Sequence, residues 1–109
     1  MLKDLIARDR EGFKRLCEAH EVKTLHAFGS SVHGPFSGDS DVDLVVDLKP
    51  SDPLTFGRLM LDLWDRLETF FGRRVDLLTL RSLKNPVMRE VIERTQVPIY
   101  DGDQAQVLV

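Results

Sequence analysis

The chain has 109 residues, of which 42% are hydrophobic and 30% are charged, as expected for one small globular domain with a modest core. It contains no apolar run long enough to cross a bilayer, and its charged N-terminus lacks the apolar segment of a secretory signal. The net charge of −3 argues against broad nucleic-acid binding, and the single cysteine, Cys17, excludes an internal disulfide. We therefore expect a cytoplasmic domain over residues 1–100 with no membrane partner and no direct nucleic-acid partner, followed by a flexible tail over residues 101–109.

The first half of the chain predicts a helix followed by two strands. Apolar residues recur at helical spacing from Leu2 to about His20. Residues 22–28 and 42–48 are short apolar runs rich in branched side chains, and each is typical of a strand. The first of these strands ends at Gly29, where the chain is expected to turn.

A long helix is predicted next, because Asp52 is a good N-cap and Pro53 suits the first helical position. Its apolar stripe continues to Phe71, and Gly72 stands where a helix commonly ends. This stripe indicates a core-facing helix.

The remaining elements follow the same alternation of helix and strand. Residues 74–80 predict a third strand, and Asn85 followed by Pro86 predicts the start of a helix that runs to about Thr95. Residues 97–100 predict a short edge strand, since Pro98 cannot donate to a ladder. The order indicates an α/β (α+β) fold with about four strands.

Acidic residues mark the start of the second strand and the middle of the third. Asp41 and Asp43 stand at alternate positions, so we expect both to point to the same side of the sheet. Two carboxylates about 7 Å apart repel each other unless a cation lies between them, and Mg²⁺ binds a few carboxylates together with phosphate oxygens and waters. Asp76, in an otherwise apolar strand, is the candidate third carboxylate. Taken singly, the first pair fits a solvated strand start as well as a metal site, and Asp76 fits an arginine partner as well as a ligand.

The turn after the first strand carries a second possible function. Gly29 allows the backbone to turn sharply and to approach a phosphate closely. The amides of Ser30 and Ser31 and the hydroxyl of Ser30 are potential hydrogen-bond donors to an anion. Without the carboxylates, an ordinary strand-ending turn would be the preferred interpretation.

Taken together, the turn and the carboxylates resemble the minimal nucleotidyltransferase family of the polymerase-β superfamily. The resemblance covers nearly the whole chain, and Asp76 falls where that family places its third carboxylate. The residues that match the family motif at its spacing are Gly29, Ser30, Gly34, Ser40, Asp41, Asp43 and Leu44.

The resemblance implies a small mixed β-sheet with helices packed mainly on one face. It also implies Mg²⁺-dependent transfer of a nucleoside monophosphate from a triphosphate, ATP by family preference, to a hydroxyl, with two metal ions at the site. The implied catalytic and metal-binding residues are Asp41, Asp43 and Asp76. The implied nucleotide-binding residues are Gly29, Ser30, Ser31 and Ser40.

The family also implies a partner, because its stand-alone domains are typically antitoxins of toxin–antitoxin pairs. Such an antitoxin transfers AMP from ATP to a tyrosine hydroxyl of a HEPN-domain ribonuclease toxin. Two alternatives remain open at this point: an antitoxin that neutralises its partner by binding alone, and a nucleotidyltransferase that acts on a small molecule.

One departure from the family pattern concerns charge at the turn. Family members often carry arginines two and four places after the glycine, where this chain has Ser31 and His33. The departure predicts either a lower affinity for the triphosphate or compensation by another cation. The candidate cations are Arg73, Arg74 and Arg81.

Overall fold

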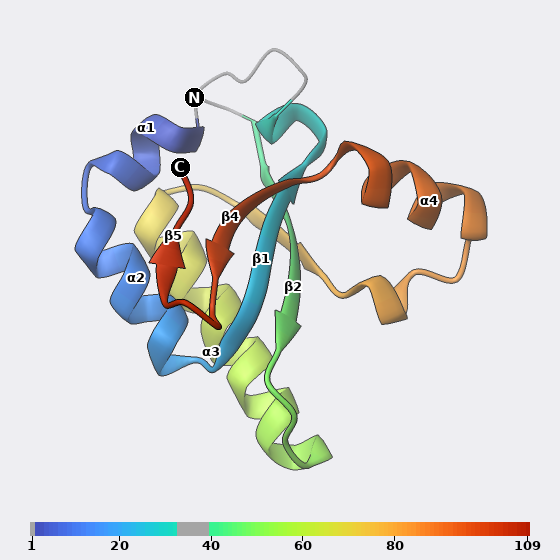
Figure 1. The fold of residues 1–109 in the computed structure, drawn as a ribbon, viewed down its shortest axis with the longest axis horizontal. Helices are drawn as coiled ribbons and strands as arrows, with labels where there is room; N and C mark the ends of the chain where they lie inside the picture. The colour runs from blue at the N-terminus through green and yellow to red at the C-terminus, as the bar shows by residue number, and fades with distance from the viewer. Residues whose placement is uncertain (1, 33–39) are drawn as a thin grey trace.

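A computed structural model of the protein describes residues 2–32 and 40–109. Four α-helices, two short 3₁₀ helices and five strands follow one another along this part of the chain (Figure 1). Their bounds in chain order are α1 Leu2–Ala7, α2 Arg10–Ala19, β1 Val22–Phe28, η1 Gly29–Ser31, β2 Val42–Leu48, α3 Pro53–Phe71, β3 Val75–Leu78, η2 Leu80–Ser82, α4 Pro86–Thr95, β4 Val97–Asp101 and β5 Gln106–Val107. No helix among the described residues is long and apolar enough to cross a membrane.

The strands form one mixed sheet in the order β3-β2-β1-β4-β5. Strands β2 and β3 are parallel, and the other neighbouring pairs are antiparallel. The mixed α/β fold predicted from the sequence is confirmed, with five strands in place of about four.

Helices α1, α2 and α3 cover one face of this sheet, and α3 runs behind the strands in Figure 1. Along β2, Val42, Leu44 and Val46 are buried against these helices, while Asp43 and Asp47 alternate to the opposite face. Helix α4 stands to the side of the sheet and buries only Ile92. The face that carries Asp43 is therefore left without a covering helix in the described part of the chain.

Local capping explains why α3 and α4 begin where the sequence predicts. The Asp52 carboxylate accepts a hydrogen bond from the Thr55 amide at 2.9 Å, and Gly72 ends α3 in the left-handed conformation with φ +66°. The Asn85 side chain accepts from the Val87 and Met88 amides at 3.0 and 3.3 Å and begins α4 in the same way.

The single helix predicted for residues 2–20 is wrong, because the chain forms two helices there. The Asp9 carboxylate accepts a hydrogen bond from the Gly12 amide at 2.9 Å and caps a new helix, α2. An aspartate side chain competes with the helix for backbone amides, and here the cap interrupts the apolar stripe. Cys17 in α2 is fully buried, and this burial raises the pKa of its thiol to about 12, which fits a packing role.

The third strand is shorter than the predicted residues 74–80, and it ends at Leu78. The Thr79 hydroxyl then accepts a hydrogen bond from the Ser82 amide at 3.2 Å and starts η2. Strand β4 is also misplaced by the sequence, because it lies between β1 and β5 instead of at the edge. Pro98 is tolerated there because β5 pairs only with Tyr100 and Asp101, beyond the proline.

The C-terminal segment differs from the loose tail expected for residues 101–109. Gln106–Val107 forms β5, Val107 is buried, and the Leu108 amide donates to the Ile99 carbonyl at 3.0 Å. The Arg10 guanidinium of α2 donates to the carbonyls of Val107, at 2.8 Å, and Val109. The partners in this contact are 97 or more residues apart, so no local pattern in the sequence predicts the contact.

The contact between Arg10 and the C-terminal segment gives a first prediction. Arg10→Ala should speed amide hydrogen exchange in residues 106–109 and lower the free energy of unfolding by about 1 kcal/mol, because two hydrogen bonds are lost. Arg15→Ala, an exposed arginine of the same helix, is the matched control. Equal exchange in the two variants would contradict the assignment.

Candidate active site

The turn that follows β1 lies directly against the first residues of β2. Gly29 has φ +63°, a conformation that side chains with a Cβ rarely adopt. A Cβ at this position would stand 2.6 Å from the Asp43 carboxylate oxygen Oδ2. The turn needs a glycine both for its backbone conformation and for the close approach of Asp43. This contact places the Asp43 carboxylate directly beside the turn.

Ser31 ties the same turn to β2 through its side chain. Its side chain is buried, and its Oγ accepts a hydrogen bond from the Asp43 amide at 2.9 Å. The sequence suggested only that the Ser31 amide faces an anion, and it gave no sign of this second contact. Ser31 therefore fixes the position of Asp43 relative to the turn. Ser30, the neighbouring candidate, is half-buried.

Asp43 and Asp76 are direct partners across the parallel ladder of β2 and β3. Adjacent strands lie about 4.8 Å apart, so the two side chains leave the sheet side by side on its uncovered face. Asp41 stands exposed just before β2. Asp43 and Asp76 thus meet on one sheet face, and Asp41 lies close enough for its charge to raise the pKa of Asp43.

The surroundings of Asp43 change the pKa of its carboxyl group. Partial burial raises the pKa of the Asp43 carboxyl above its ordinary value of 3.8, and the charges of Asp76 and Asp41 raise it further. A cation bound among the three carboxylates would remove the repulsion between them.

The carboxylates form an open arrangement and not a closed cage. Among the residues that the structure describes, no group of three or more acidic, histidine or cysteine side chains is drawn together closely enough to hold a metal ion by itself. Mg²⁺ does not require such a group, because it commonly takes one or two carboxylates and completes its shell with phosphate oxygens and waters. The like-charged pair of Asp43 and Asp76 fits a cation that arrives together with a phosphate ligand.

Ser40 and Arg73 are also joined at this end of the sheet. The Arg73 guanidinium Nη1 donates to the Ser40 carbonyl at 3.2 Å, which places a cation beside the residue that precedes Asp41. Of the three arginines considered as substitutes for turn arginines, Arg74 is exposed and Arg81 lies beyond β3 in η2. The motif residues His33 and Gly34 lie outside the described residues.

Comparison with known proteins adds a family to this geometry. Residues 11–105 match the profile of the family described as polymerase beta, nucleotidyltransferase. The protein adenylyltransferase MntA of Thermococcus cleftensis is 37% identical over 79 residues, which cover 72% of this chain and 77% of that protein.

Two solved structures share the fold. One, assigned as a minimal nucleotidyltransferase, is 37% identical with a TM-score of 0.64 and is matched over 89% of this chain and 94% of its own. Another, a toxin–antitoxin crystal structure with AMP-PNP, has a TM-score of 0.63 at 20% identity, with 88% and 76% of the two chains covered. At that identity the likeness concerns the fold alone.

The repulsion at Asp43 gives a second prediction, on stability. Because the folded-state pKa is raised, the stability that the protonated carboxyl provides is complete below pH 3.8 and is lost as the pH rises through the folded-state pKa. Asp43→Asn should therefore raise the melting temperature at pH 7 by about 2 °C, a small gain because the group is partly solvent-screened.

This gain should disappear below pH 3.8, where the wild-type carboxyl is also neutral. Asp47→Asn, an exposed position four residues along the same strand, is the control for the loss of one negative charge. Thermal melts at several pH values without divalent cations measure both variants. A lower melting temperature for Asp43→Asn at pH 7 would show that the three carboxylates do not repel one another.

Proposed function

Because the chain belongs to the polymerase beta nucleotidyltransferase family, we propose that it is a Mg²⁺-dependent antitoxin that transfers AMP from ATP to a tyrosine hydroxyl of a HEPN-type toxin. The observation that carries the proposal is the pairing of Asp43 with Asp76 on an open sheet face, directly beside the turn at Gly29. The name of the Thermococcus relative, a protein adenylyltransferase, supports AMP as the transferred group.

The toxin partner has separate support. One chain of a toxin–antitoxin complex crystallised with AMP-PNP shares the fold of this chain. The acceptor hydroxyl has to reach Asp43 and Asp76 on the open sheet face, and a partner surface can present it there. A HEPN-type toxin with an accessible tyrosine meets that need.

In the proposed reaction, Asp41, Asp43 and Asp76 would together hold Mg²⁺. The bound metal supplies positive charge that offsets the triphosphate and the carboxylates. The backbone amides of the turn, with the hydroxyl of Ser30, hold phosphate oxygens and orient the chain of phosphates along the sheet edge.

The bond changes follow from that placement. The tyrosine oxygen forms a bond to the α-phosphorus in line with the bond from that phosphorus to the leaving oxygen, which breaks and releases pyrophosphate. The hydroxyl proton passes to the Asp76 carboxylate, which lies on the same face as Asp43. Tyrosine needs such a base because its ordinary pKa is about 10.

A second candidate function, neutralisation by binding alone, is favoured by one observation. The turn carries Ser31 in place of an arginine, and the Ser31 hydroxyl is occupied with the Asp43 amide. This contact stabilises the turn but adds no charge for a triphosphate. The two candidates differ in whether a covalent product forms.

The test is to incubate the full chain with a HEPN-type toxin, Mg²⁺ and α-labelled ATP, and to measure the label and the mass of the toxin. We expect an AMP adduct on a toxin tyrosine and a loss of at least about 100-fold in its rate of formation for Asp43→Asn and Asp76→Asn. Asp65→Asn, an exposed aspartate of α3 away from the turn, is the control.

The outcomes separate the candidates. Neutralisation of the toxin without any adduct would support binding alone, and an adduct on a small molecule in place of the toxin would point to a metabolite acceptor. Label transfer that survives in both aspartate variants would reject the assigned site.

A further inference from the structure

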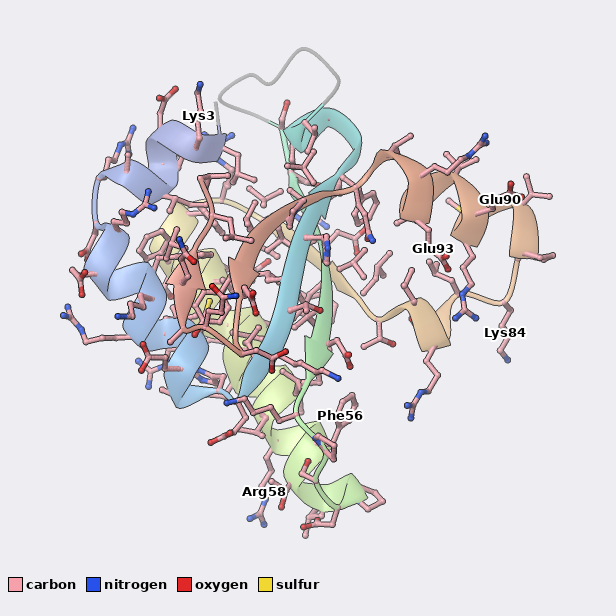
Figure 2. All side chains as sticks on the ribbon, in the orientation of Figure 1. Lys3, Phe56, Arg58, Lys84, Glu90 and Glu93 are labelled. Carbon is pink, nitrogen blue, oxygen red and sulfur yellow. The ribbon has the colours of Figure 1, made fainter. Side chains whose placement is uncertain are left out.

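A broad groove lies on the uncovered face of the sheet, next to the carboxylates and not over them. It has a volume of about 900 Å³, and His26 of β1 and Val45 of β2 lie on its floor. Residues 79–82 and Phe56 also line the groove, and Phe56, near the start of α3, lies below the strands in Figure 2. None of these residues has a role in the site described above.

The groove is continuous with the carboxylate pair through the register of the sheet. Val45 follows Asp43 on the same face of β2, and it pairs with Leu78 as Asp43 pairs with Asp76. Two residues along a strand span about 6.6 Å, so the groove begins at about that distance from Asp43 and Asp76 and extends away from them. A chain lying in the groove would bring a neighbouring side chain to Asp43 and Asp76.

The groove has the opposite charge to the protein as a whole. Four cations line it, and Asp47 is the one acidic residue among its described lining residues, whereas the complete chain has a net charge of −3. Arg89 pairs with Glu93 in its own helix at 3.1 Å, whereas no ion pair is found for the other three cations within the described residues. These three are Lys23, Lys49 and Arg81.

The position of these cations indicates which kind of ligand they bind. The triphosphate is assigned to the turn at the other end of β2, and the base and ribose of a nucleotide are neutral, so neither accounts for cations at the far end of the strand. A nucleic acid would have to pass the carboxylates and an acidic surface, which repel phosphates. Phe56 is 38% exposed at the groove and offers an apolar contact of the kind that protein segments use.

We propose that this groove binds an acidic segment of the partner protein and thereby delivers the acceptor side chain to Asp43 and Asp76. The part of the inference that concerns the acceptor rests on the proposed function. The binding of an acidic segment rests on the groove and its charges alone, so the two can fail separately.

The test uses two fluorescein-labelled peptides, each with one tyrosine, flanked in one by glutamates and in the other by lysines. Fluorescence anisotropy without ATP should show that the wild-type protein binds the glutamate peptide at least tenfold more tightly. The double variant Lys49→Glu with Arg81→Glu should lose at least tenfold in affinity for the glutamate peptide and gain affinity for the lysine peptide.

A matched control changes the charge by the same amount elsewhere. Lys3→Glu with Arg58→Glu alters two exposed cations that Figure 2 places away from the groove, and it should leave the affinity for the glutamate peptide within about twofold. Equal losses in the two double variants would show an effect of net charge only and would overturn the inference. Equal binding of both peptides by the wild-type protein would overturn it as well.

Two further arms identify the ligand and separate the proposals. A short RNA that binds more tightly than the glutamate peptide, and loses its affinity in the groove variant, would reject the acidic protein segment in favour of nucleic acid. Asp43→Asn should keep its affinity for the glutamate peptide while it loses AMP transfer. If the wild-type protein transfers no AMP but still binds the glutamate peptide in a charge-dependent way, the proposed function fails and the groove assignment stands. If AMP transfer occurs but the groove variant leaves the KM for the toxin unchanged, only the groove assignment fails.

Discussion

The candidate site depends on holding two carboxylates, those of Asp43 and Asp76, side by side on neighbouring parallel strands. These charges repel each other, so the free energy that holds them together must come from elsewhere in the sheet. It comes from the opposite face, where Val42 and Leu44 of β2 pack in register with Val75 and Leu77 of β3 under the helices. A slip of one residue would expose this apolar set to water, so the buried face fixes the register and thereby forces the carboxylates together.

The two faces of the sheet therefore have different tasks. The covered face supplies stability through contacts that are local to the core, and the uncovered face presents charged groups that cost stability. Contacts such as the one between His20 and Asp62, at 2.6 Å, join α2 to α3 on the covered side and take no part in the site. Gly29 and Ser31 join the turn to β2. Gly29 leaves room for the Asp43 carboxylate, and the Ser31 hydroxyl accepts a hydrogen bond from the Asp43 amide.

The sequence predicted correctly those features that depend on interactions between residues close together in the chain. Helices α3 and α4 were predicted with their correct starts because Asp52 and Asn85 act within three residues of their own position. Strands β1 and β2 were predicted with their correct bounds because Gly29 and Pro50 end these two segments within two positions of the last strand residue. The resemblance to a nucleotidyltransferase was correct because its motif is also local in sequence.

The errors have the opposite origin. The place of β4 beside β1 depends on pairs such as Thr24 with Asp101, and no short pattern in the sequence encodes such a distant contact. The Asp43 amide donates to the Ser31 hydroxyl twelve positions earlier in the chain. The sequence does not show this contact, so it predicted only a hydrogen bond from Ser31 to a phosphate. The groove escaped notice because its cations come from β1, the end of β2, η2 and α4, which only the folded chain assembles.

The direction of the strands also separates the arginines considered as substitutes for the missing turn arginines. Since β2 and β3 are parallel, their first residues meet at one end of the sheet, and Arg73, just before β3, lies there with Ser40. Arg81 follows β3 and is carried to the other end, where it lines the groove. Cations that the sequence presents as interchangeable are thus separated by the length of one strand. Under the two proposals above, Arg73 would act on the nucleotide and Arg81 on a partner, so mutation of either should affect a different ligand.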